Sequence, residues 1–145
     1  MALFSCPDVD KGSVMGYVDE YRVLGLKARW LKEERAKNAY ANALQFSSNE
    51  RYGLNEHTTE KVERHIIESR SVADAWLKAR LRAEGTLQVV YGPDHVCVVD
   101  AAAFINCWQD VFVPSRDDAI VLHNIDKTVF FYCHEEELEV GTRRF

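Results

Sequence analysis

The spacing of apolar residues changes at Gly85, and this change limits the chain to a mixed fold. Before it, apolar side chains recur at intervals of three and four residues over residues 14–31 and again over 62–83, which is the spacing of one helix face. After it, short runs rich in β-branched and aromatic residues are separated by turn residues, as in strands. We therefore expect an α+β fold.

The first half of the chain predicts a long N-terminal antiparallel helical hairpin. One helix is expected over residues 13–46 and the second over residues 56–85. An unbroken first helix would be about 50 Å long, whereas a compact chain of this size is roughly 40 Å across. It is therefore expected to bend at Gly16 or Gly25, or to protrude and form a homodimer through residues 13–84.

Residues 86–145 predict a ββαββ antiparallel-sheet unit. The runs TLQVVYG and HVCVVD flank a Gly-Pro-Asp turn, and AIVLHN and KTVFFYCH flank a turn at Ile125 and Asp126. Between the two hairpins, Asp100 is expected to cap a short helix, AAAFINCWQDVF, whose large apolar residues share one face. The chain is thus divided into a helical hairpin over residues 1–85, for packing or oligomerisation, and the ββαββ unit.

The negative charge of the protein is concentrated in the second half. The net charge is −5, to which residues 1–85 contribute +1 (14 basic and 13 acidic residues) and residues 86–145 contribute −6 (4 basic and 10 acidic residues). Such a surface repels nucleic acids and anionic membranes and attracts basic partners. We therefore expect a basic protein partner and contact with neither a membrane nor a nucleic acid.

Cys133 and His134 stand side by side in the stretch FFYCHEEELEVG, a combination found in active sites. A tight turn in the preceding hairpin places Val121 opposite Phe130, and side chains then alternate between the two faces of the sheet. Neighbouring residues in a regular strand point to opposite faces. Cys133 and His134 are therefore not expected to form the hydrogen-bonded dyad that a cysteine nucleophile needs.

The same register argues against a metal site in the hairpin. His123 and His134 are expected about 20 Å apart, whereas zinc ligands converge on one ion at about 2.0–2.3 Å. Asp117 is expected to lie opposite His134 and to contact it. If the protein instead has a pocket between the sheet and the helices, its polar groups are Asp117, His123, Tyr132 and His134.

The chain lacks the short signatures of common enzymes and cofactor sites. It has no GxGxxG or Walker loop, no GxSxG elbow, no HExxH and no EF-hand loop, so we expect no cofactor, no metal and binding rather than catalysis. Its four cysteines include no CxxC pair, and the start of the sequence has neither a basic n-region nor an apolar h-region. We therefore expect free thiols and a cytoplasmic location.

Acidic residues from two segments are expected to meet at the open end of the second hairpin. One segment precedes the AIVLHN strand and the other follows the KTVFFYCH strand. Gathered carboxylates repel one another, and a cationic partner relieves that repulsion. The expected binding patch consists of Asp117, Asp118, Glu135, Glu136, Glu137 and Glu139.

These features favour a non-enzymatic protein that masks the basic surface of a target, such as a toxin or nuclease-like protein. Bacterial immunity proteins and phage-encoded inhibitors act in this way, and the chain is similar to them in charge and size. There are two alternatives. One is a small-ligand-binding domain or enzyme with a pocket between sheet and helices, and the other is a structural homodimer formed through the helical hairpin.

Overall fold

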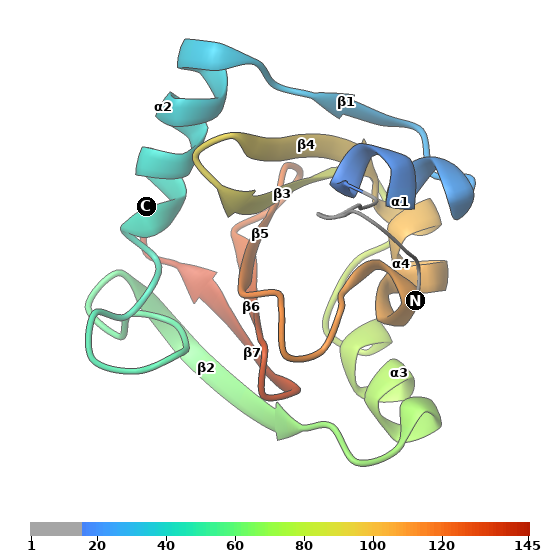
Figure 1. Cartoon of the computed structure of the whole chain (residues 1–145). Helices are drawn as coiled ribbons and strands as arrows, with labels where there is room; N and C mark the ends of the chain where they lie inside the picture. Colours follow the sequence, from blue (N-terminus) through green and yellow to red (C-terminus); the bar gives the residue numbers. More distant parts are fainter. Residues whose placement is uncertain (1–15) are drawn as a thin grey trace.

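Short apolar runs in the described part of the chain build a central sheet of seven strands. The computed structural model describes residues 16–145, and Figure 1 shows the sheet with helices on both faces. All neighbouring strands are antiparallel. Their spatial order is β1 (Ala28–Trp30), β4 (His95–Asp100), β3 (Thr86–Gly92), β5 (Ala119–His123), β6 (Thr128–Cys133), β7 (Glu137–Arg143) and β2 (Thr59–Ile66).

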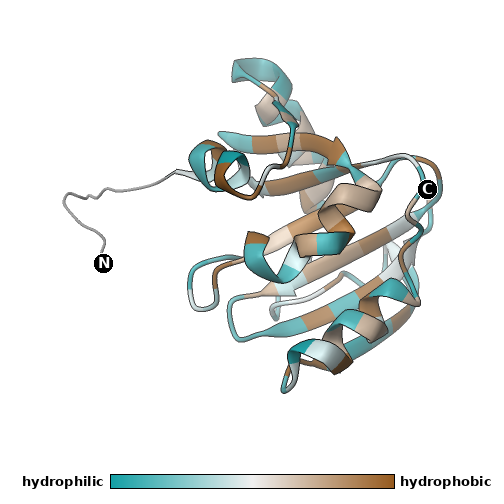
Figure 2. Ribbon diagram, turned by 90° about the vertical axis from the view of Figure 1, so that its right-hand side faces the viewer, coloured by the Kyte–Doolittle hydropathy of each residue, from teal (hydrophilic) through white to brown (hydrophobic). Residues whose placement is uncertain are grey.

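Within residues 16–145, four helices cover the two faces of the sheet. α1 (Tyr17–Val23), α3 (Arg70–Lys78) and α4 (Ala101–Val111) pack on one face, and α2 (Glu33–Leu44) packs on the other (Figure 1). Because successive strand side chains point in opposite directions, the four inner strands β3, β4, β5 and β6 supply residues to the cores on both faces. Figure 2 shows hydrophobic residues along the strands, with hydrophilic positions interspersed on some of them. The expected α+β class is confirmed.

Much of the second half folds as its sequence predicts. The order β3, β4, α4, β5, β6 is the expected ββαββ unit. Asp100 caps α4 by accepting a hydrogen bond from the Ala103 amide at 3.0 Å. Val121 pairs with Phe130, as the predicted register requires. The chain then continues into β7, which lies between β6 and β2.

The expected helix over residues 13–46 is wrong within the described residues. The segment forms α1, the short edge strand β1 and α2. Gly25 marks the first break, as one of the two expected weak points: its φ of +76° is a left-handed conformation that glycine adopts without strain. The chain then pairs with β4 rather than continuing the helix. The expected N-cap Ser13 lies outside the described residues.

The second expected helix, over residues 56–85, is also wrong. Its first part is β2, which pairs with the exposed edge of β7, and only α3 is helical. Thr59, Val62 and Ile66 are β-branched residues that suit a strand. Ser69 caps α3 by accepting a hydrogen bond from the Val72 amide. The helical hairpin on which the expected homodimer depended is therefore not formed.

Strands from both halves of the chain share one sheet. β1 and β2 come from residues 1–85 and lie at its two edges, outside the five strands from residues 86–145. Within the described part of the chain, no helix combines the length and the apolar character needed to cross a bilayer. The three described cysteines, Cys97, Cys107 and Cys133, are free thiols.

Candidate functional site

A groove of about 500 Å³ opens on the face of the sheet that α2 covers. Tyr40 and Leu44 from the C-terminal part of α2 form one wall. The loop after α2, residues 47–52, forms a second wall. The floor consists of strand residues, among them Ile120 and Phe131. The groove therefore combines aromatic and apolar surface with the polar residues of a loop.

A buried ion pair holds this loop in place. Glu139 of β7 is 4% exposed, and its carboxylate accepts hydrogen bonds from the Arg51 guanidinium and, at 2.9 Å, from the Leu54 amide. Gly53 lies directly against the pair, because a Cβ atom there would lie 2.7 Å from a Glu139 carboxylate oxygen. Buried Phe46 and Leu54 anchor the two ends of the loop in the core.

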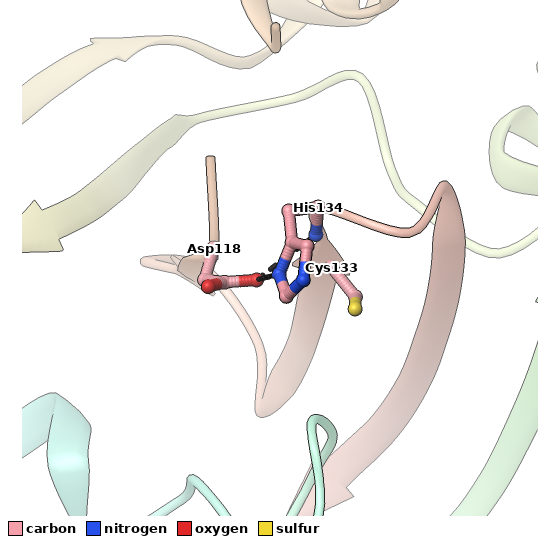
Figure 3. Close-up of side chains that lie close together, drawn as sticks. All are labelled: Asp118, Cys133 and His134. Atoms are coloured by element: carbon pink, nitrogen blue, oxygen red, sulfur yellow. Dashed lines mark hydrogen bonds and ion pairs between the residues drawn. The ribbon is translucent and has the colours of Figure 1, made fainter. Parts of the chain in front are cut away.

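Asp118 lines the groove, and its side chain lies close to those of Cys133 and His134 (Figure 3). The backbone amide of His134 donates a hydrogen bond to Asp118 Oδ1 at 2.9 Å, and His134 Nδ1 lies 2.9 Å from the same oxygen. Tyr52 from the groove loop packs edge-on against the imidazole, with ring centroids 4.8 Å apart. One ligand atom from each of Asp118, Cys133 and His134 lies within 4.8 Å of the other two.

The expected separation of Cys133 and His134 is therefore wrong. β6 ends at Cys133, and the following residues form a turn in which Glu136 has a φ of +61°. The amide of Glu136 donates to the carbonyl of Cys133 at 2.8 Å and closes this turn. Because His134 is no longer in a strand, the alternation between faces does not apply to it. Its ring can then lie on the same side as the Cys133 thiol.

The electrostatics of this cluster do not favour a cysteine nucleophile. Burial raises the pKa of the Cys133 thiol above its ordinary value. A reactive cysteine needs the opposite shift, because the thiolate is the nucleophile. The hydrogen bond to Asp118 raises the pKa of His134, since it stabilises the imidazolium form. The arrangement fits an oriented Asp–His pair beside a protonated thiol.

His134 contacts Asp118 and not Asp117, so the expected contact is wrong by one residue. Asp117 points into the protein instead, and its side chain is fully buried. It accepts hydrogen bonds from the Tyr17 hydroxyl at 2.9 Å, Arg116 Nε at 2.8 Å and the Val113 amide at 2.7 Å. Asp117 therefore attaches α1 and the loop before β5 to the core.

The structure divides the six residues of the expected acidic patch into two groups. Asp117 and Glu139 are buried and paired with arginines, and Glu137 pairs with Arg64 at the surface. Asp118 remains partly exposed, and its side chain is 38% accessible. Glu135 and Glu136 are exposed in the turn that carries His134. Three of the six residues therefore remain available for an external partner.

The four residues proposed for an alternative pocket do not line one cavity. His123 lies at the far end of β5 from Asp117 and is 1% exposed. Its Nε2 lies 2.9 Å from the Arg82 carbonyl, and its Nδ1 accepts from the Ile125 amide at 3.3 Å. Tyr132 is also buried and stacks on Phe112, with ring centroids 4.4 Å apart. His123 and Tyr132 therefore have structural roles.

The groove loop is the part of the site that the sequence did not reveal. Glu50 and Tyr52 lie in a segment without periodicity, between α2 and β2.

No protein-family model matches the chain, and no curated protein or solved structure is significantly similar to it. The function must therefore be inferred from the chemistry of the groove.

Proposed function

We propose that the protein is a non-enzymatic binding protein whose groove receives a basic segment of a target protein and so masks it. The observation that supports this proposal is the charge around the groove. Glu50 and Asp118 line it, and Glu135 and Glu136 are exposed in the turn beside it. Arg51 is the cation in the lining, and Glu139 and Glu56 already pair with it.

The groove suits a lysine or arginine side chain in two respects. Its lining includes the aromatic residues Tyr40 and Tyr52, which can attract a cation, and its apolar floor can cover the aliphatic stem of the side chain. Both hydrogen bonds from His134 go to Oδ1 of Asp118, which leaves Oδ2 for a donor from the partner. A basic segment would thus find an ion pair and an aromatic contact in the same groove.

The net charge of −5 acts over a longer range. Opposite charges on two proteins speed their encounter and favour the correct partner over others. We propose a cytoplasmic location for this binding, which the free thiols support because disulfides are rare in that compartment. Immunity proteins and phage-encoded inhibitors are similar to the chain in charge and size.

A charge-reversal experiment tests the proposed binding surface. The E135K/E136K variant should bind a synthetic oligolysine peptide at least about tenfold more weakly than the unaltered protein, because it removes the two exposed carboxylates beside the groove. Affinity is measured by fluorescence anisotropy at low and at physiological salt. The difference should shrink as salt rises, since exposed charges are screened.

The chain offers a matched control for this variant. Glu33 and Glu34 are adjacent, exposed glutamates at the N-terminal end of α2. The groove begins on this helix at Tyr40, six residues from Glu34 or about 9 Å along the helix axis. E33K/E34K changes the net charge by the same amount and should retain most of the affinity. Equal losses in the two variants would show that only net charge matters and would remove the groove as the binding site.

A further inference from the structure

We propose that Asp118, Cys133 and His134 form a three-ligand binding site for Zn²⁺ beside the groove. One oxygen, one sulfur and one nitrogen atom from these residues lie within 4.8 Å of one another (Figure 3). Asp118 directly precedes β5, Cys133 ends β6, and His134 lies in the turn after it. This proposal goes beyond the binding of a basic segment and does not depend on it.

The present geometry is close to that of a tetrahedral zinc site. Zinc bonds of about 2.0–2.3 Å separate neighbouring ligand atoms by about 3.3–3.7 Å in a tetrahedron. Asp118 Oδ1 and His134 Nδ1 are already 2.9 Å apart, so they would move apart by only a few tenths of an ångström. Cys133 Sγ would approach the other two by at most about 1.5 Å, given the 4.8 Å limit. A side-chain rotation or a small shift of the turn supplies such a movement.

The chemistry of the three ligands favours zinc over other common ions. Mg²⁺ and Ca²⁺ prefer oxygen ligands alone, whereas Zn²⁺ accepts thiolate, imidazole and carboxylate together. Cys133, which is 1% exposed, would supply the soft thiolate after its thiol releases a proton to solvent on metal binding, and the harder oxygen comes from the partly exposed Asp118. A site with one buried and one accessible side lets the ion enter from the groove.

Neighbouring groups already orient the proposed ligands. The Glu135 amide donates to Cys133 Sγ at 3.4 Å, the His134 amide donates to Asp118 at 2.9 Å, and the Tyr52 ring packs against the imidazole. Such outer contacts orient the ligands of a metal site and contribute to its affinity. With three protein ligands, the fourth position remains open to water or to a donor atom in the groove. Glu50, Glu135 and Glu136 stay free for a basic segment.

Cobalt spectroscopy of the full chain tests this site without any binding partner. The protein is treated with a chelator and titrated with Co²⁺, which substitutes for Zn²⁺ and reports its own ligands. A thiolate ligand should give a near-ultraviolet charge-transfer band, and tetrahedral coordination should give intense visible bands. Added Zn²⁺ should abolish both sets of bands. The charge-transfer band should be lost in Cys133→Ser and kept in Cys97→Ser, a control at an equally buried strand position, and in Cys6→Ser.

Variants at the two accessible ligands keep the test decisive if Cys133→Ser does not fold. Loss of an outer contact weakens metal binding by about 10–100-fold, and Asp118→Asn and His134→Ala should each weaken Zn²⁺ binding by more than that. His57 is exposed and distant in sequence, so His57→Ala should leave Zn²⁺ binding unchanged. Absence of a charge-transfer band in the unaltered protein would overturn the proposal. So would a band that persists in Cys133→Ser but is lost in Cys97→Ser or Cys6→Ser.

Discussion

Asp117→Ala is expected to lower the free energy of unfolding by about 3 kcal/mol, whereas Asp118→Ala should have a much smaller effect. The two residues are adjacent acids, but their surroundings differ. The Asp117 side chain is fully buried, and that of Asp118 is 38% exposed. The pair therefore tests whether the structure assigns the correct aspartate to the core and the correct one to the groove.

The large effect at Asp117 follows from what its carboxylate holds together. It accepts from Arg116, from the Val113 amide and from the Tyr17 hydroxyl of α1. Burial, followed by the charge of Asp117, raises the pKa of Tyr17, so its hydroxyl stays protonated and remains a donor. Removal of the carboxylate leaves these donors unsatisfied and leaves the Arg116 guanidinium with Glu20 as its acidic partner.

Chemical denaturation followed by tryptophan fluorescence measures both variants under identical conditions. Binding of oligolysine provides a second readout, because Asp118→Ala should weaken it while the variant remains folded. A larger loss of stability in Asp118→Ala than in Asp117→Ala would contradict the assignment of the two residues.

Arg51→Ala is expected to lower the free energy of unfolding by about 2–3 kcal/mol. The substitution leaves the carboxylate of Glu139, which is 4% exposed, without its cation. The Leu54 amide remains a donor to Glu139 but does not neutralise its charge. This loss in the free energy of unfolding is smaller than is usual for a broken buried ion pair. The reason is that the Arg51 side chain is 39% exposed, so solvent partly screens its charge. Proteolysis should also become faster in the groove loop, residues 47–52.

Arg64→Ala is the matched control, because its acidic partner Glu137 lies on β7, the same strand as Glu139. Arg64 of β2 bonds to Glu137 of β7, but both side chains are more exposed than Glu139. Its replacement should leave the midpoint of denaturation nearly unchanged, because surface ion pairs contribute little to stability. If Arg51→Ala is as harmless as Arg64→Ala, the buried pair does not hold the groove loop.

The β5–β6 hairpin and α4 were predictable because local signals determine them. A tight turn between two alternating runs sets the register, and the observed pairing of Val121 with Phe130 agrees with it. α4 has an N-cap, Asp100, and a single apolar face that includes Phe104 and Trp108. Neither element needs information from distant parts of the chain.

The prediction of a helical hairpin was wrong because the spacing of its apolar residues fits both a helix and a strand. Contacts with distant parts of the chain decide between the two. In residues 59–66, Val62 and Ile66 fit a helix by their spacing of four, but they also fit a strand, whose period of two divides four. The edge of β7 is available to pair with this segment, and no local signal reveals that edge. The same holds for β1, which pairs with β4 about 70 residues further along the chain.

The site was missed for similar reasons. The prediction assumed that the strand continued through His134, but it ends one residue earlier, and the turn redirects the imidazole. The groove loop has no periodicity, and Arg51 is fixed by Glu139, 88 residues away in sequence. The sequence shows where the acidic residues are, but not that Asp117 and Glu139 are buried and therefore cannot meet a partner.

A basic segment is proposed to bind in the groove beside Asp118. This is tested by titrating the isotopically labelled protein with the oligolysine peptide while the chemical shifts of its backbone amides are recorded by nuclear magnetic resonance. We predict that the largest changes fall on residues 47–52, on Asp118 and on residues 134–136. Largest changes on β2 or α3, or no saturable change at any amide, would contradict the claim.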